Sequence, residues 1–206
     1  MRNIIFGVFL MGVSLFSVAA EPAPGTSGEV VAKLNATLVE VMKNAKALGY
    51  QGRYDVLAPV MLATHDFESV SKIAVGKHWK TLSDGQQDTL VKKLTEFSIA
   101  SYAAQFDSYS GEEFVYQSEQ PGKNDRVTVH YVLKAKDEPE HKFAYTLQQV
   151  NGTWRIINTV VDGFSNLASM KAQYEQVIES EGFDSLIKKL SEKIANYSKS
   201  RSEKNS

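Results

Sequence analysis

The 206-residue chain contains no cysteine, and this absence limits how the protein can be stabilised and anchored. Disulfide bonds are excluded, as is a lipid attached to a cysteine at a processed amino terminus. Stability must therefore come from a buried apolar core. Beyond residue 20 the chain also lacks any apolar run of the ~20 residues that a membrane span requires.

An excess of charge of one sign is missing as well. The chain has 23 Lys+Arg against 24 Asp+Glu, a formal net charge of −1. Basic pairs such as Lys92-Lys93 and Lys188-Lys189 lie in helical patterns, where a solvated helix face is the simpler interpretation. The composition therefore gives no indication of nucleic-acid binding.

Motifs of the common enzyme classes are absent from the sequence. It has no HExxH, no GxSxG, no glycine-rich phosphate loop and no cysteine nucleophile. Its four histidines have no pair at the i, i+3 or i, i+4 spacing of a helical metal site; they are His65, His78, His130 and His141. We therefore expect no catalytic residue, no metal and no cofactor.

The two ends of the chain have their own signals. Arg2, the apolar run from Ile4 to Val18 and Ala19-Ala20 have the three zones of a secretory signal peptide. Residues 1–20 are predicted to be removed, with an uncleaved anchor as the alternative. Residues 21–197 then have the size of one domain, since a domain takes about 100 to 200 residues. Residues 198–206 are predicted to be a disordered tail.

The stretch from Lys142 to Val161 is the most informative part of the sequence. Asn151-Gly152 is the two-residue signal of a type I′ hairpin turn. Counting outward from this turn predicts the pairs Val150 with Thr153, Gln149 with Trp154, Leu147 with Ile156, Tyr145 with Asn158 and Phe143 with Val160. One face of the hairpin would then carry its large apolar side chains and needs a cover, either a helix or a hydrophobic ligand.

Helical periodicity flanks the strands on both sides. A first helix is predicted from Val30 to a stop at Gly49, and a second over Arg53–Leu62. A third follows Asp66 and ends at Gly76, and a fourth begins with the Ser83/Gln86 capping box and reaches Ser108. Two strands, Glu113–Ser118 and Arg126–Lys136, precede the hairpin, and two helices separated by Gly182 come after it. The sequence predicts an α+β fold with helices packed on one face of a curved four-stranded antiparallel sheet.

Several blocks of the chain resemble the family of periplasmic lipid-binding proteins that includes MlaC and the toluene-tolerance auxiliary proteins. They are Val75–Phe97 (VGKHWKTLSDGQQDTLVKKLTEF), Tyr102–Gly111 (YAAQFDSYSG), Gly152–Gly163 (GTWRIINTVVDG) and the helix with Gln173-Tyr174. The segment Leu48–Val60 (LGYQGRYDVLAPV) is more similar to the hopanoid-biosynthesis-associated, HpnM-like branch.

The resemblance implies a periplasmic carrier that holds the apolar part of a phospholipid or hopanoid. It would shuttle this lipid between an inner-membrane transporter and outer-membrane lipid-transfer complexes. The expected lining is the apolar hairpin face, its neighbouring strand and the long helix: Leu94, Phe97, Val129, Tyr131, Phe143, Tyr145, Leu147, Trp154, Ile156 and Val160. Plain core packing is the competing interpretation for each of these residues.

Two other functions remain open at the level of the sequence. The first is an enzyme of NTF2-like fold that acts on an isoprenoid or steroid-like molecule, for which the predicted Tyr145–Asn158 pair would bind a carbonyl. No carboxylate falls on that face to act as a general base. The second is a scaffolding subunit of an envelope complex, which would need an exposed apolar patch without a cavity.

Overall fold

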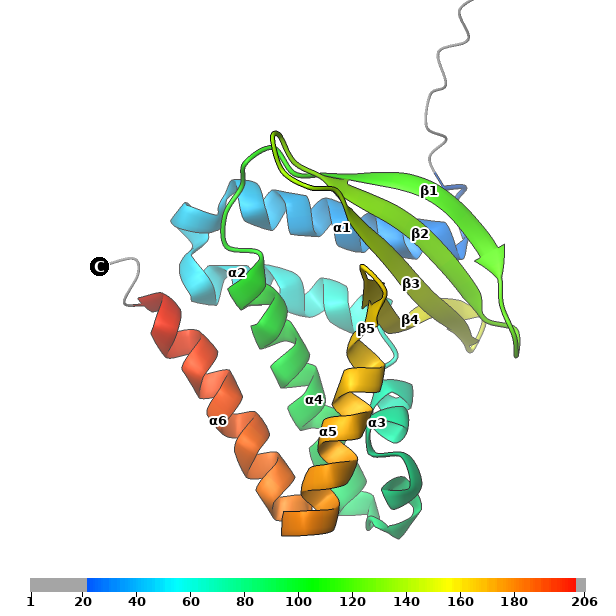
Figure 1. Ribbon diagram of the computed structural model, residues 1–206, viewed down its shortest axis with the longest axis vertical. Helices are drawn as coiled ribbons and strands as arrows, with labels where there is room; N and C mark the ends of the chain where they lie inside the picture. Colours follow the sequence, from blue (N-terminus) through cyan, green and yellow to red (C-terminus); the bar gives the residue numbers. More distant parts are fainter. Residues whose placement is uncertain (1–21, 203–206) are drawn as a thin grey trace, which may run out of the picture.

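The computed structural model describes residues 22–202, with side chains as far as Lys199, and has an α+β fold (Figure 1). Helices come first, strands follow and helices return, in the order that the sequence predicted. The elements are α1 (Ser27–Lys43), α2 (Ala45–Thr64), α3 (Phe67–Val75), the 3₁₀ helix η1 (Gly76–Thr81), α4 (Asp84–Gln105), β1 (Glu113–Pro121), β2 (Val127–Lys134), β3 (His141–Val150), β4 (Thr153–Val161), β5 (Phe164–Ser165), α5 (Asn166–Glu181) and α6 (Phe183–Ser202). Within residues 22–202, no helix combines the length and apolar composition of a membrane span.

The strands form one antiparallel sheet in which each strand pairs with the next along the chain. Four strands were predicted, and the structure adds a fifth because the chain reverses at Asp162-Gly163 instead of passing directly into a helix. Both residues have positive φ, 50° and 86°, which suits a two-residue hairpin turn. The short strand β5 then pairs with the end of β4.

The β3–β4 register is confirmed near the turn and wrong farther from it. A β-bulge between Thr146 and Leu147 on the β3 side leaves Ile157 of β4 as an extra residue. Between the turn and the bulge, all three pairs predicted are formed: Val150–Thr153, Gln149–Trp154 and Leu147–Ile156. Beyond the bulge Tyr145 lies opposite Thr159 instead of Asn158, and Phe143 lies opposite Val161 instead of Val160.

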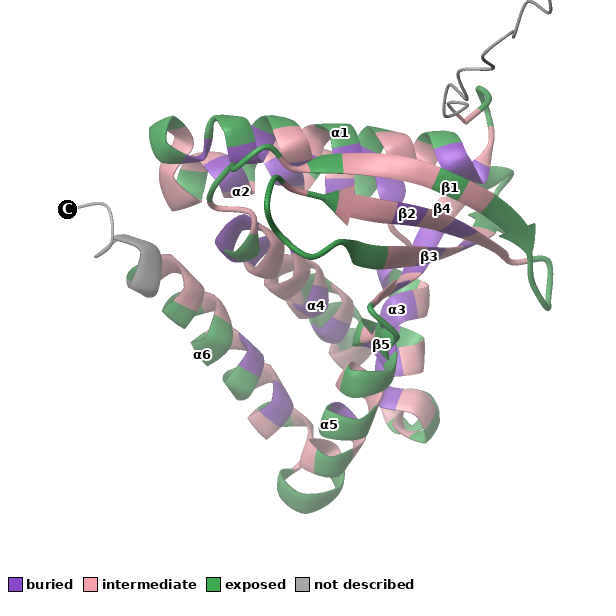
Figure 2. Ribbon diagram, turned by 45° about the horizontal axis from the view of Figure 1, so that its top comes forward, coloured by how far each residue is buried: buried purple, intermediate pink, exposed green. Residues whose placement is uncertain are grey.

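Two separate groups of buried side chains hold the fold together. The first, here the sheet cluster, joins one face of the sheet to α1, α2, Phe67 and the second half of α4: Val31, Leu34, Leu38, Val41, Leu57, Met61, Phe67, Ile99, Ala103, Val129, Tyr131, Tyr145, Leu147 and Ile156. The second, the helical cluster, joins α3, the first half of α4, α5 and α6: Val70, Ala74, Val75, Leu90, Leu94, Leu167, Tyr174, Leu186 and Leu190. In Figures 1 and 2, α1 and α2 lie against the sheet, whereas α4, α5 and α6 extend away from it.

The start and stop signals of the helices are largely confirmed. The Ser83/Gln86 capping box is formed, and the Asp66 side chain caps α3. Gly76 ends α3 with φ of 50°, and a Cβ at this position would collide with the Glu175 carboxylate. Other bounds were misplaced: α2 spans Ala45–Thr64 instead of Arg53–Leu62, α4 stops at Gln105, and α6 continues to Ser202, past Tyr197. The first residues of the expected disordered tail are thus helical.

Gly49 does not end the first helix as predicted. The helix α1 stops at Lys43, and Gly49 instead kinks α2 with φ of 61°. One turn later Arg53 is only 2% exposed; its Nε donates to the Ala103 carbonyl at 2.7 Å and its Nη1 to the Ala45 carbonyl at 3.0 Å. Ala103 lies in the last turn of α4, where carbonyls lack helical partners, so Arg53 joins α2 to the end of α4.

The hydroxyl of Tyr145 makes a buried polar contact inside the sheet cluster. It donates to Asn35 Oδ1 of α1 at 2.8 Å, and burial raises the pKa of Tyr145 well above its ordinary value.

We expect Tyr145→Phe to lower the free energy of unfolding by about 1–2 kcal/mol, because Asn35 Oδ1 loses its donor in the core. Urea titration measures the change. The matched control is Tyr109→Phe at a side chain that is 41% exposed, where less than about 0.5 kcal/mol is expected. Equal effects of the two changes would contradict this role.

Candidate functional site

The structure brings most of the predicted lining residues together, but as packed core. Val129, Leu147 and Ile156 are fully buried, and Tyr131 and Tyr145 are 5% and 1% exposed. Phe143 and Trp154 pack against this group at its edge. The apolar face of the hairpin therefore packs against α1 and α2 in the described structure.

Three predicted lining residues lie elsewhere. Leu94 and Phe97 belong to the helical cluster, and the Phe97 ring lies 6.0 Å from that of Tyr197 in α6. The reason is the length of α4, whose first half faces α6 while Ile99 and Ala103 reach the sheet. Val160 pairs with Ala144 on the opposite face of the sheet, because the bulge at Ile157 shifts every residue after it.

A small cavity lies at the seam between the two clusters. Its volume is about 60 Å³, enough for water but too small for an acyl chain. We call it the seam cavity; its walls come from α2, α3, α4, β4 and α5, and its lining residues are Met61, His65, Phe67, Val70, Ser98, Tyr102, Ile156, Ile157, Asn158, Thr159, Asn166, Leu167 and Met170. Most of its accessible wall is apolar, and residues of both clusters contribute.

An aromatic group forms one wall of the seam cavity. The His65 ring stacks on Phe67 with centroids 5.3 Å apart and meets the edge of Tyr102 at 6.4 Å. Burial lowers the pKa of His65 to about 4, which keeps the imidazole neutral near pH 7. Burial also raises the pKa of Tyr102, against the opposing effect of a hydrogen bond with Thr159. An apolar ligand packs more favourably against neutral rings than against charged groups.

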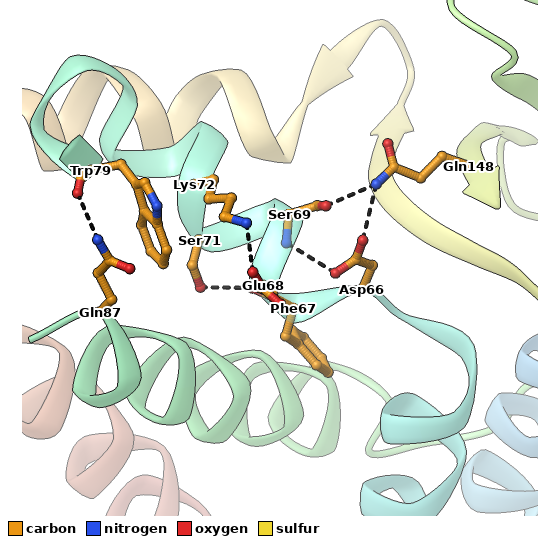
Figure 3. Close-up of polar contacts among 9 residues, drawn as sticks. All are labelled: Asp66, Phe67, Glu68, Ser69, Ser71, Lys72, Trp79, Gln87 and Gln148. Carbon is orange, nitrogen blue, oxygen red and sulfur yellow. Dashed lines mark hydrogen bonds and ion pairs between the residues drawn. The ribbon is translucent and has the colours of Figure 1, made fainter. Parts of the chain in front are cut away.

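A polar junction fixes the start of α3 beside this cavity (Figure 3). The Asp66 carboxylate accepts from the backbone N–H of Ser69 at 2.9 Å and from Gln148 Nε2 of β3 at 2.9 Å. Gln148 Nε2 also donates to Ser69 Oγ at 2.8 Å. Burial alone would raise the pKa of Asp66, but these hydrogen bonds lower it below its ordinary value. The junction therefore ties the sheet to α3 between His65 and Phe67.

A second and larger hollow lies beside α1, at the β1 edge of the sheet. It measures about 910 Å³, is open to solvent and runs between α1 and the strand β1. We call it the α1–β1 groove; its lining residues are Pro22, Glu29, Ala32, Asn35, Ala36, Val39, Lys43, Tyr109, Gly111, Glu112, Glu113, Phe114, Val115, Tyr116 and Tyr131. Of the predicted lining residues, Tyr131 alone borders this groove, and Ile156 alone borders the seam cavity.

Comparison with protein families identifies the chain. The family model described as MlaC protein matches residues 32–192, which run from α1 into α6 and include every residue of both clusters except Val31. The chain belongs to the MlaC family. These comparisons give no support for the predicted hopanoid-associated branch of the family.

Two relatives of this MlaC-family chain cover most of its length. The toluene tolerance protein ttg2D of Pseudomonas putida is 20% identical over 182 residues, which are 86% of this chain and 82% of that protein. A phospholipid-binding protein from Ralstonia solanacearum, solved in complex with a phospholipid, superposes with a TM-score of 0.71 at 19% identity. This likeness covers 83% of the present chain and 96% of the other, and it establishes the shared fold.

Sequence reasoning missed most of the seam cavity. His65 was considered only as a metal ligand, and Met61, Tyr102 and Met170 were not predicted to line a cavity. His65-Asp66 stands at the break between two helical patterns, which was the available signal that these residues lie at a junction. Neither periodicity nor register could show that α5 closes the same cavity, because that contact is made 100 residues later in the chain by Asn166–Met170.

The low pKa of His65 predicts acid sensitivity. A folded pKa of about 4 against an unfolded value near 6.5 means that the unfolded chain binds the proton first. Stability should fall as pH decreases from about 6.5 to about 4, by on the order of 1–2 kcal/mol at pH 5. Urea titrations at pH 7 and pH 5 should show that His65→Gln loses this amount less than the parent protein. The same change at His130, on β2 and outside the seam cavity, is the control and should keep the parent's acid loss.

Asp66 should contribute to stability both as a helix cap and as the acceptor for Gln148. We expect Asp66→Ala to lower the free energy of unfolding by about 1–2 kcal/mol, and Asp66→Asn to cost less, since asparagine also caps helices. Chemical denaturation at pH 7 provides the measurement. Glu68→Ala, which removes only an exposed ion pair with Lys72, should change stability by less than about 0.5 kcal/mol. A cost at Glu68 as large as that at Asp66 would refute the junction's role.

Proposed function

We propose that this protein is a periplasmic lipid carrier that holds the apolar part of a phospholipid at the seam between its two clusters. The observation that carries the proposal is the seam cavity, an apolar hollow where two independently packed cores meet. Membership of the MlaC family and the likeness to a fold solved with a bound phospholipid support it.

The seam is a better place for acyl chains than the interior of the sheet cluster. In the sheet cluster, side chains such as Val129 and Leu147 are fully buried, and separating them would expose the core of the protein. At the seam, the two clusters can move apart while each keeps its own contacts. Met61 of α2 and Met170 of α5 both line the cavity, and methionine adapts to irregular shapes at low cost.

A lipid needs a carrier because exposing its hydrocarbon chains to water costs free energy. Each buried CH₂ is worth ~0.8 kcal/mol, so exposing a chain of about sixteen carbons to water costs on the order of 12 kcal/mol. An interior that shelters the chain lowers this barrier without favouring either direction of transfer. Direction then depends on partners, and we infer that these are an inner-membrane transporter and an outer-membrane lipid-transfer complex.

The finer identity of the lipid also belongs to this proposal. The resemblance of Leu48–Val60 to the hopanoid-associated branch makes a hopanoid the second ligand to test beside a phospholipid. Aromatic and aliphatic walls such as those of Phe67, Tyr102 and Leu167 suit an acyl chain and a fused ring system alike. The enzyme alternative relied on a Tyr145–Asn158 pair, which the structure does not form; the Tyr145 hydroxyl donates to Asn35 instead.

Filling the seam should abolish lipid retention. We expect Met170→Trp to reduce the lipid-bound fraction of the purified protein at least tenfold, because the larger side chain occupies the space between α5 and the sheet. Native mass spectrometry after gentle purification measures this fraction. Extraction of the released lipid, and competition between phospholipid vesicles and hopanoid-containing vesicles, identifies the preferred ligand.

The matched control is Ala36→Trp, which places the same side chain in the α1–β1 groove. This variant should retain lipid like the parent protein. Loss of lipid in Ala36→Trp with retention in Met170→Trp would move the lipid site to the groove. Absence of lipid from the parent protein, both as purified and after incubation with vesicles, would end the carrier proposal.

A further inference from the structure

The α1–β1 groove has a use that goes beyond lipid binding. We propose that it is a docking site in which an extended, basic segment of a partner protein adds to the free edge of β1. The groove and the seam cavity share no lining residue, so a partner and a lipid can be bound at the same time.

The strand side of the groove is a sheet edge. In the described part of the chain β1 is the outermost strand and pairs only with β2. Alternate backbone N–H and C=O groups of an edge strand point away from the sheet and can pair with another strand. The Val115 carbonyl already accepts from Gln117 Nε2 at 3.2 Å, so an added strand that paired with this carbonyl would displace the Gln117 side chain. Four consecutive residues of β1, Glu113 to Tyr116, line the groove. Since side chains alternate between faces, a consecutive run indicates that the backbone edge itself borders the hollow.

The opposite wall is a single stripe of α1. Glu29, Ala32, Ala36, Val39 and Lys43 recur at helical spacing along it. The small side chains of Ala32 and Ala36 at the centre of this stripe leave open space between α1 and β1. A groove between a helix and an edge strand is the geometry in which several domains bind extended peptides by strand addition. The volume of about 910 Å³ lies within the usual range for built binding sites.

Charge and one unpaired amide define the occupant. Glu29, Glu112 and Glu113 border the groove against one lysine, Lys43, so its rim attracts positive charge. Asn35 is 3% exposed and lines the groove, and among the described residues its Nδ2 has no hydrogen-bond partner. Its Oδ1 is already used by Tyr145. A backbone carbonyl brought in by the added strand would satisfy this donor, which free acyl carbons cannot do.

The length of the occupant follows from β1. Its pairing with β2 is regular from Glu113 to Tyr116 and is then interrupted by a bulge at Gln117. A bulge ends regular pairing and turns an edge away from further addition. The added strand is therefore short, about four to five residues, with apolar side chains toward Phe114 and Tyr116 and lysine or arginine at the rim.

The test uses the full protein and a nine-residue peptide that alternates lysine and valine, with a glutamate–valine peptide of the same length as control. We expect saturable binding of the lysine peptide in fluorescence anisotropy with Kd below 1 mM, and slower hydrogen exchange at the amides of residues 113–116. Ala36→Trp should weaken binding at least tenfold. Glu113→Lys should weaken it at least threefold, whereas Glu138→Lys, the same charge change in the β2–β3 loop, should not.

Several results would overturn the proposal. The first is the absence of saturable binding at 1 mM peptide. The second is equal binding of the lysine and glutamate peptides, because the groove would then recognise only apolar side chains. Slow exchange, in the free protein, of those amides of residues 113–116 that point away from β2 would show that the chain's own segment before Pro22, or a second copy, already fills the groove. Because Ala36→Trp leaves the seam cavity untouched, loss of peptide binding with retained lipid separates this proposal from the carrier function.

Discussion

The extra residue in β4 is the constraint on which the two-part architecture depends. Strict alternation along a strand allows only every second residue to face a given layer. The bulge at Ile157 places two consecutive isoleucines in the interior, Ile156 in the sheet cluster and Ile157 at the seam cavity. It also puts Asn158 on the opposite face, where its Oδ1 accepts from Ser165 Oγ at 3.1 Å and from the backbone N–H of Leu167 at 3.3 Å. One inserted residue thus joins the sheet to the start of α5.

The same strand anchors the other side of the seam. The backbone N–H of Asp66 donates to the Ile156 carbonyl at 3.0 Å, and His65 forms an isolated bridge with Ile156. The start of α3 and the start of α5 are therefore both hydrogen-bonded to β4 or its neighbours, on either side of the cavity. In the proposed carrier, these polar contacts would hold the two walls in place, while the apolar surfaces between them have no directional bonds to break when a lipid enters.

Helix α1 borders the groove at the β1 edge of the sheet, whereas the seam lies at β4 and has no α1 residue in its lining. Its buried stripe, with Leu34 and Leu38, fills the sheet cluster, and its other stripe, with Ala32 and Ala36, leaves the groove beside β1. A lipid carrier must both hold a guest and recognise the proteins that deliver and receive it. In the two proposals above, the lipid and the partner bind at places that share no lining residue, so the partner surface would stay constant while lipid enters and leaves the seam.

The amino-acid sequence by itself determined the element order, the α+β class and the helix boundaries at Asp66, Gly76 and Ser83, because Asp66, the Ser83/Gln86 capping box and Gly76 act on backbone groups within a few residues of themselves. It also determined the family, whose motifs are spread over the chain, and the hairpin register from Thr153 to Ile156, which the Asn151-Gly152 turn fixes locally. The predicted signal peptide covers residues 1–20, outside the described residues, and stays a prediction. Tertiary structure decided the rest. The bulge at Ile157 arises because β4 must pack against the sheet cluster and α5 at once, and the split between the clusters depends on where along α4 each neighbour lies. The contacts that form the cavity and the groove join residues far apart in sequence, and no local pattern encodes which distant surfaces will meet.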